Sequence, residues 1–293
     1  MLHVFSEEWM HEMPQHSYVL IINRLTIPIL IKVDSVNSPR DTDLTPQQQV
    51  SSPRTIFLPL IVLVCLTLVT QLGSLAYTFD GSFLSVAGPS ALVLCGITIP
   101  LAASGLILGR KIGLGATLLT DLLNRVPGSG RKLCSDAWLS ISLGLGFGIL
   151  LLLLRFASRP HLPPDLPELG HRGVVGGLMV SISAAVGEEV WLRLGVMTIL
   201  AWIFLRLLGR HKVSPVVGWF AVVVSAFAFA AIHLPQLASY GAANSVGVVG
   251  TILGNTFVGV LFGYLYWRRS LIAAMLAHFA VDLALHVLPA LGT

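Results

Sequence analysis

The stretch Gly187–Arg193, GEEVWLR, places three charged residues, Glu188, Glu189 and Arg193, in the middle of a long apolar run. The run extends from about residue 174 to 208, which exceeds the roughly 20 residues that an α-helix needs to cross a bilayer. Charge is costly at membrane depth, so ionisable side chains in a membrane span indicate function by default. This stretch therefore predicts a transmembrane helix that carries a site.

The composition of the whole chain is that of a polytopic membrane protein. Of the 293 residues, 55% are hydrophobic and only 11% are charged, whereas a soluble domain carries about 25% charged residues. The formal net charge is +4, but the basic residues lie between apolar runs, where membrane topology explains them better than a nucleic-acid partner. The three cysteines have no ligand-like spacing and predict neither a disulfide framework nor a thiolate metal site.

On both sides of the charged stretch, apolar runs alternate with short loops. This pattern predicts an all-α transmembrane helical bundle of about seven spans. The first two spans and their loop cover residues 55–134, and the remaining spans form a core over residues 135–290. Residues 1–54 are more polar and predict a short, soluble, partly disordered extension without a signal peptide. The expected spans cover residues 56–78, 82–109, 137–157, 174–208, 215–233, 244–266 and 270–288.

Lysine and arginine concentrate in alternate loops. The positive-inside rule then predicts an integral multi-pass protein with a cytoplasmic N-terminus and an outer C-terminus. The residues that would lie on the cytoplasmic side are Arg54, Arg110, Lys111, Arg125, Arg131, Lys132, Arg206, Arg210, Lys212, Arg268 and Arg269.

Two later spans carry polar residues at helical spacing. Phe229 precedes His233 by four residues, and His278 precedes Asp282 by four. Residues four apart share a helix face, so His278 can lie beside Asp282. In a nearly charge-free core, these residues are candidates for chemistry.

The same spacing divides the opening stretch into two roles. Glu189 can pair with Arg193 on one helix face, which leaves Glu188, about 100° around the helix, free to face the bundle interior. Glu188 and His233 could then share a water as a general base and its partner. His278, oriented by the carboxylate that follows it, could donate a hydrogen bond to the oxyanion of a tetrahedral intermediate.

Each feature also has a structural explanation. His233 could be a packing residue, His278 with Asp282 a helix-stabilising pair, and Glu189 with Arg193 an ion pair. Together they favour an active site, but two other functions stay open. One is a proton- or cation-coupled transporter with these residues as a relay, although the chain shows no internal repeat. The other is a non-catalytic membrane scaffold.

The ordered motifs Glu-Glu-x-x-x-Arg, Phe-x-x-x-His and His-x-x-x-Asn/Asp on successive spans resemble those of the CPBP family, the CAAX-processing and bacteriocin-processing (Abi-type) intramembrane proteases. The resemblance covers about residues 135–290. It implies a CAAX prenyl protease-like intramembrane endopeptidase. The substrate would be a membrane-embedded or lipid-anchored peptide or protein, prenylated or leader-bearing.

By matching positions, the resemblance implies that Glu188 is the base, that His233 is its water-binding partner, and that His278 with Asp282 stabilises the oxyanion. The residues that would brace the site are Glu189, Arg193 and Phe229. The family has been described both with and without a divalent metal such as zinc. The ligands of such a metal would be Glu188, His233 and His278, although a His-Glu-x-x-His spacing is absent.

Depth in the membrane conflicts with this assignment if the helices are straight. Counted at about 1.5 Å per residue from the expected cytoplasmic ends, Glu188 and His233 lie about 27 to 28 Å deep and His278 only about 14 Å. Convergence of the three residues therefore requires that the long fourth span tilts, bends or continues beyond the lipid, or that the fifth span begins earlier.

Overall fold

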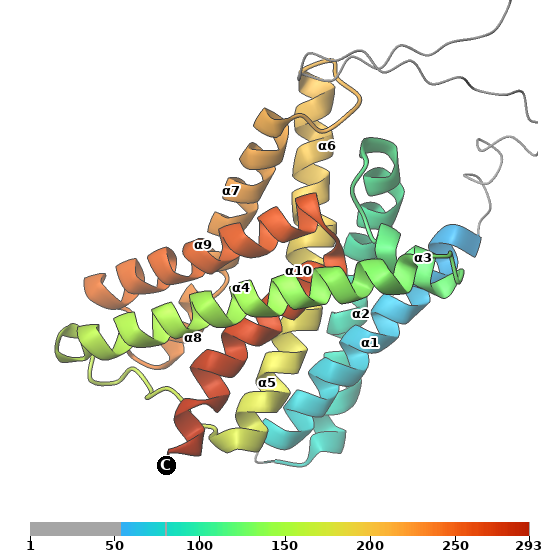
Figure 1. Ribbon diagram of the computed structural model, residues 1–293. Coiled ribbons are helices and arrows are strands. Elements are labelled where there is room, and N and C mark those ends of the chain that lie inside the picture. Colours follow the sequence, from blue (N-terminus) through green and yellow to red (C-terminus); the bar gives the residue numbers. More distant parts are fainter. Residues whose placement is uncertain (1–53, 80, 293) are drawn as a thin grey trace, which may run out of the picture. The chain divides into compact units, whose positions relative to one another are not determined.

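The computed structural model describes residues 54–79 and 81–292, and every regular element in these ranges is a helix (Figure 1). The predicted all-α architecture is confirmed. The predicted extension over residues 1–54 lies outside the described residues except for Arg54. The described residues form one compact unit, and residues 134 and 135, between which a boundary is expected, lie in one helix.

Seven segments of the described chain are long and apolar enough to cross a membrane, as the sequence predicts. The fourth span consists of α5, η4 and α6 in series, and the fifth of α7 and α8. In chain order the elements are α1 (Arg54–Thr78), α2 (Phe83–Ile112), α3 (Thr117–Leu123), α4 (Ser129–Ser158), the 3-10 turn η3 (Arg159–His161), α5 (Gly173–Glu188), the π-helix η4 (Glu189–Met197), α6 (Thr198–Leu207), α7 (Pro215–Ala231), α8 (Leu234–Ser239), α9 (Ser245–Arg268), α10 (Leu271–Asp282), the π-helical turn η5 (Leu283–Val287) and the 3-10 turn η6 (Pro289–Leu291).

Helix α4 begins at Ser129, well before residue 137, where the third span is expected to start. The added turns contain Asp136, whose side chain is fully buried in the bundle. The ammonium of Lys132 lies 2.8 Å from one Asp136 oxygen, and Arg269 lies 3.7 Å from the other. Because these cations neutralise the carboxylate, the charged segment continues as helix instead of forming the expected loop.

The fourth and seventh spans form the centre of the bundle. In the most apolar 18-residue stretch of each of these two spans, half of the residues are buried, compared with 17% in the first and third spans. The peripheral helices α2 and α4 instead present large apolar side chains to the outside, including Leu84, Leu92 and Trp138. An apolar exterior of this kind matches a lipid environment. In Figure 1, α5 and α6 run in line through the bundle.

The π-helix η4 packs directly against the backbone of α2. A Cβ atom on Gly105 would lie only 2.1 Å from the Leu194 carbonyl oxygen, and one on Gly195 would lie 2.8 Å from Cβ of Leu101. Only glycine permits this approach. Helices α7, α9 and α10 contact η4 as well, so the segment that carries Glu189 and Arg193 is enclosed by four transmembrane helices.

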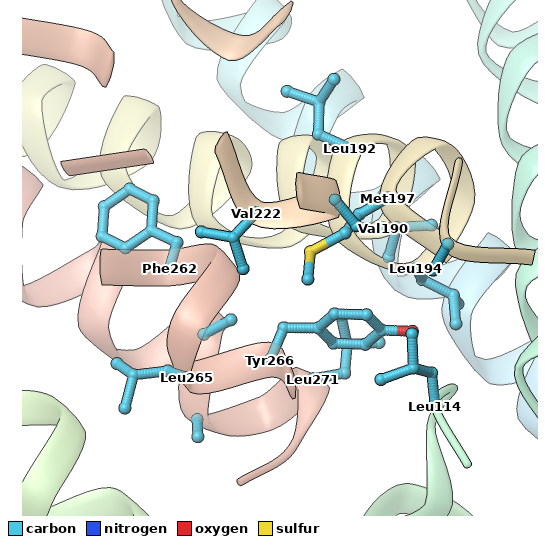
Figure 2. Packing of buried hydrophobic residues seen from close by; sticks show 14 of the residues in the cluster. Leu114, Val190, Leu192, Leu194, Met197, Val222, Phe262, Leu265, Tyr266 and Leu271 are labelled. Carbon is cyan, nitrogen blue, oxygen red and sulfur yellow. The ribbon is translucent and has the colours of Figure 1, made fainter. Parts of the chain in front are cut away.

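A chain of hydrogen bonds ties α9 and the α2–α3 loop to η4. The amide of Gly115 donates to the Tyr266 hydroxyl (2.9 Å), which lies 2.6 Å from Thr198 Oγ1. Thr198 in turn donates to the Arg193 carbonyl (3.3 Å). A carbonyl can only accept, so the Tyr266 proton points toward Thr198. Figure 2 shows the Tyr266 ring among the buried side chains, with its oxygen directed toward Leu114.

Helix α10 packs closely on α4 through two glycines. A Cβ atom on Gly144 would lie 2.4 Å from the Ala277 carbonyl oxygen, and one on Gly148 would lie 2.8 Å from that of Val281. Glycines four residues apart allow helix backbones to approach each other within a membrane. The contact fixes α10, which carries His278 and Asp282, relative to the rest of the bundle.

Candidate active site

The motif residues come from the fourth, fifth and seventh membrane spans. Glu188 ends α5 and Glu189 begins η4, so the change from α- to π-helix falls between the two adjacent carboxylates. His233 lies in the two-residue turn between α7 and α8, and α10 carries His278 and, at its last position, Asp282. π-Helical segments often occur at functional sites, where the wider turn redirects side chains.

Glu189 and Arg193 form the expected ion pair. Nε of Arg193 lies 3.2 Å from Oε2 of Glu189, and both side chains have an exposed fraction of 0%. Removal of one member would leave an unpaired charge in a medium of low dielectric constant, which is strongly destabilising. The pair therefore holds η4 together as long as both charges are present.

Arg193 makes further contacts with α7 and α9. Its Nη1 donates to the backbone carbonyl (3.4 Å) and hydroxyl (3.3 Å) of Ser225. The guanidinium also lies over the rings of Phe229 and Phe262, 5.2 and 5.9 Å from their centroids. Cation–π contacts of this kind contribute most when the cation is desolvated, so the two rings help to stabilise the buried charge.

His278 contacts two carboxylates. Its Nδ1 lies 2.9 Å from Oε1 of Glu189, and its Nε2 lies 3.6 Å from Oδ2 of Asp282. The first distance is that of a hydrogen bond, whereas the second exceeds it. The side-chain partner at hydrogen-bond distance is thus Glu189 on another helix, not Asp282 one turn away as the sequence predicts.

The contact between His278 and Glu189 also removes the expected mismatch in depth. The fourth span is 35 residues long, more than a bilayer requires. Glu188 and Glu189 lie near its middle, because α6 continues for ten residues beyond η4. The expected depth is counted from residue 208, the predicted cytoplasmic end of this span. It therefore places the two carboxylates too far from the start of α10.

The orientation of His233 follows from its backbone contact. Nδ1 of His233 lies 2.7 Å from the Phe229 carbonyl oxygen. Because a carbonyl only accepts hydrogen bonds, Nδ1 carries the proton and the neutral ring keeps a lone pair on Nε2. An imidazole in this tautomer can accept a proton or a hydrogen bond from water.

Two phenylalanine rings connect the histidines. The Phe229 ring lies 4.9 Å from the His233 ring and 5.6 Å from the His278 ring, measured between centroids. The Phe262 ring stacks on His278 at 4.5 Å with an interplanar angle of 12°. Both imidazoles therefore pack on one phenyl ring, which restricts their rotation and keeps them in one region of the bundle.

Glu188 differs from its neighbour because it forms no ion pair with the described residues, whereas Glu189 forms two. Glu188 is partly exposed as a residue, but its Oε2 is buried and has no hydrogen-bond partner among the described residues. Glu189, in contrast, receives a hydrogen bond from His278 at Oε1, and its Oε2, which also lacks a hydrogen bond in the described part of the chain, forms an ion pair with Arg193 at 3.2 Å. A buried acceptor without a partner is costly, so Glu188 is the carboxylate that is available to a water or a substrate.

Asp282 interacts electrostatically with several ionisable side chains of the site. Its carboxyl interacts with His278, His233, Glu188 and His286. The other three residues expected to take part in chemistry are thus within interaction range of Asp282. In chemical terms the arrangement combines an unpaired carboxylate, an imidazole with a free lone pair, and a second imidazole held between two carboxylates.

Residues of α1 and α2 brace the carboxylate segment from outside the three motifs. Nε1 of Trp191 donates to Thr98 (2.9 Å), and Nε2 of Gln71 donates to the Ser183 carbonyl (2.9 Å). A Cβ atom on Gly187 would lie 2.4 Å from this Gln71 nitrogen. The glycine before Glu188 therefore makes room for the Gln71 side chain.

The side chains named from the sequence as metal ligands are not grouped around one point in the described residues. No group of three or more His, Cys, Asp or Glu side chains there is arranged to hold a metal ion. His278, named from the sequence as a ligand with Glu188 and His233, directs both ring nitrogens at carboxylates. Metal coordination needs a free lone pair on such a nitrogen, so this arrangement would have to change.

Two of the contacting residues are not predicted from the sequence. Ser225 could have been found, because it precedes Phe229 by four residues and so lies on the same helix face as Phe229 and His233. Phe262 gives no such signal, since its role depends on how α9 packs against α7 and α10.

One comparison with known proteins gives a match. Residues 171–284 match a family model described as Rce1-like, Type II CAAX prenyl endopeptidase Rce1-like. No curated protein and no solved structure matches the chain. The matched range is narrower than the residues 135–290 expected to resemble such proteases, and it begins after α4. It contains all seven residues proposed for the site, namely Glu188, Glu189, Arg193, Phe229, His233, His278 and Asp282.

Proposed function

Because residues 171–284 match the Rce1-like model of type II CAAX prenyl endopeptidases, we propose that this integral multi-pass membrane protein hydrolyses a peptide bond with Glu188 as its general base. The single observation that carries the proposal is the unequal bonding of the adjacent carboxylates. Glu189 pairs with both Arg193 and His278, whereas Glu188 forms no ion pair and its Oε2 has no hydrogen-bond partner among the described residues.

His233 is the second group that binds the attacking water. Its protonated Nδ1 is fixed on the Phe229 carbonyl, so the lone pair of Nε2 can accept a hydrogen bond from that water. A carboxylate and an imidazole that share one water can position it and take up its proton. Packing of His233 on Phe229 limits the directions in which Nε2 can point.

In the proposed reaction, the water oxygen bonds to the carbonyl carbon of the substrate as Glu188 takes the water proton. The C–N bond of the tetrahedral intermediate then breaks, and Glu188 returns the proton to the leaving amine. The products are a carboxylic acid and an amine. General acid–base catalysis of this kind typically contributes about 10²–10⁴-fold to the rate.

His278 and Asp282 are assigned to the oxyanion. Nδ1 of His278 donates to Glu189, so Nε2 is the nitrogen that remains for the substrate. When Nε2 is protonated it can donate to the oxyanion, and Asp282, 3.6 Å away, offsets the charge of the ring. Donors fixed before the reaction stabilise developing negative charge at little reorganisation cost.

The substrate of such a site is a membrane-associated peptide or protein, and the family description favours a prenylated one. The distribution of lysine and arginine supports a cytoplasmic N-terminus and an outer C-terminus. The reaction is written with side chains of the chain alone, because no three His, Cys, Asp or Glu side chains of the described residues are grouped to hold a metal.

The test is cleavage of a prenylated membrane peptide by purified protein in lipid nanodiscs. We expect Glu188→Gln and His233→Ala each to lower kcat by about 10²-fold or more while the variants keep their thermal stability. Glu168→Gln is the matched control, because it makes the same chemical change at an exposed carboxylate that belongs to none of the three motifs. Wild-type rates in Glu188→Gln would overturn the assignment, and ion flux without cleavage would favour a transporter.

A further inference from the structure

A basic cavity lies where α2 and α6 end on the same side of the bundle. Its lining includes Lys111, Trp202, Arg206, Arg210 and His211, and its volume is about 30 Å³. At about 10–15 Å³ for one enclosed water, this space accepts about two water-sized groups. It therefore suits the oxygens of one small anion and not a peptide.

The positive charges of this cavity have no protein counter-charge in the described ranges. None of the ion pairs formed there includes Lys111, Arg206 or Arg210. The sequence also contains no acidic residue between Asp80 and Asp121. It contains none between Glu189 and Asp282 either. The cavity is thus a concentration of positive charge that attracts anions.

Trp202 supplies a second, independent observation. Its Nε1 is buried and has no hydrogen-bond partner among the described residues. The guanidinium of Arg206 lies over the Trp202 ring, 5.3 Å from the centroid. This contact uses the ring face and leaves the N–H donor at the ring edge unsatisfied. A buried donor without a partner costs stability, and an acceptor in the cavity would remove that cost.

The position of the cavity favours a lipid over a free ion. Ile112 and Leu207 are the last residues of two membrane spans, so the cavity lies at the level where spans meet the head groups. Ile107 and Ile203, about one turn further into the membrane from Lys111 and Arg206, are exposed apolar residues. A phospholipid would place its phosphate at the basic residues and its acyl chains along these isoleucines.

We propose that the cavity between the ends of α2 and α6 binds the head-group phosphate of one anionic phospholipid. Arg206, Arg210 and Lys111 supply the positive charge, and Trp202 Nε1 donates a hydrogen bond to a phosphate oxygen. The site contains none of the residues assigned to catalysis, so it is independent of the proposed peptidase activity.

The experiment is native mass spectrometry of the purified full-length protein released from nanodiscs with equal amounts of phosphatidylglycerol and phosphatidylcholine. We expect one retained phosphatidylglycerol per protein. Arg210→Gln and Lys111→Gln should each weaken its retention about five-fold, since one basic residue near a membrane surface contributes about that factor. Both side chains are exposed, so the variants should fold.

Arg268→Gln is the matched control, because Arg268 is an exposed arginine that stacks on Trp267 outside the cavity. It should retain the lipid as the wild type does. An equal loss in Arg268→Gln would mean that binding follows net charge and would overturn the proposal. Trp202→Phe keeps a ring for Arg206 but removes the donor, and unchanged retention would exclude the hydrogen bond. Displacement of the lipid by millimolar inorganic phosphate would identify a free-phosphate site instead.

Discussion

Two buried carboxylates, Glu189 and Asp136, hold α10 in place, and they differ in the exposure of their partners. Glu189 contacts the middle of α10 through His278, and Arg193, its other partner, is fully buried. Asp136 accepts a hydrogen bond at 2.9 Å from Ser270, the residue that caps the start of α10. Its cations, Lys132 and Arg269, have exposed fractions of 45% and 43%.

This difference shows that the burial of a carboxylate does not by itself determine how much stability is lost when its cation is removed. When a cation of Asp136 is removed, water can reach the place that it leaves. When Arg193 is removed, nothing solvates Glu189. A buried charge that loses its partner typically costs about 3–5 kcal/mol, whereas an exposed pair contributes only about 0–1 kcal/mol. Substitutions at the two centres can test this comparison.

The largest effect is expected for Arg193→Met. It removes the cation that pairs with Glu189 and contacts Phe229 and Phe262, and should lower the free energy of unfolding by about 3–5 kcal/mol. Denaturation in mixed detergent micelles measures this loss. Arg206→Met, an exposed arginine further along the same span, is the control. A loss below about 1 kcal/mol for Arg193→Met would contradict the comparison.

The second prediction concerns the coupling free energy between Glu189 and Arg193. In Glu189→Gln with Arg193→Met, no unpaired charge remains, so the double variant should lose less stability than the two single variants together. The coupling should be about 0.5–3 kcal/mol. A double-mutant cycle in the same detergent provides the value. Simple additivity would show that the buried pair does not act as a unit.

Asp136→Ala should have a moderate effect. The change leaves Ser270 without its carboxylate partner, but Ser270 Oγ still accepts from the Ala273 amide at 3.1 Å. We expect a loss of about 1–3 kcal/mol and faster hydrogen exchange at the first turn of α10. Unchanged exchange there would mean that Asp136 does not hold the start of this helix.

The smallest effect is expected for Lys132→Gln. Lys132 is about half exposed and pairs with Asp136 at 2.8 Å, so its removal should cost about 0–1 kcal/mol. The difference from wild type should shrink when the ionic strength rises from about 0.1 M to about 1 M, because salt screens exposed charges. A loss above about 1 kcal/mol that does not depend on salt would mean that the Lys132–Asp136 pair behaves as a buried ion pair.

Most of the fold could be predicted from the sequence, because apolar runs of sufficient length have few alternatives to a transmembrane helix. The expected span at 56–78 matches the structure, whereas the expected start at 137 does not. Counting charged residues as loop residues fails at Asp136, since the neutralising Arg269 is more than a hundred residues away in the chain. Long-range pairing of this kind leaves no local pattern.

The candidate site was predictable where helical spacing decides a contact and unpredictable where packing does. The Glu189–Arg193 pair follows from residues four apart on one helix, and the structure contains it. The hydrogen bond from His278 to Glu189 depends on the place of the π-helix η4 within the bundle. No composition or spacing in Glu189–Met197 predicts a π-helix, and the contacts of Phe262 depend on the same packing. The catalytic roles stay a proposal.

The pairing of Glu189 with Arg193 within one helical segment also bears on biosynthesis. The fourth span leaves the ribosome and enters the membrane before His278, 89 residues after Glu189, has been synthesised. Each lone charge at the centre of an inserting helix costs about 2.5–3.5 kcal/mol. With its own counter-ion in the same segment, Glu189 can enter the lipid before its final partner exists. The ion pair thus allows the fourth span to insert before α10 is made, and the same pair is then part of the assembled site.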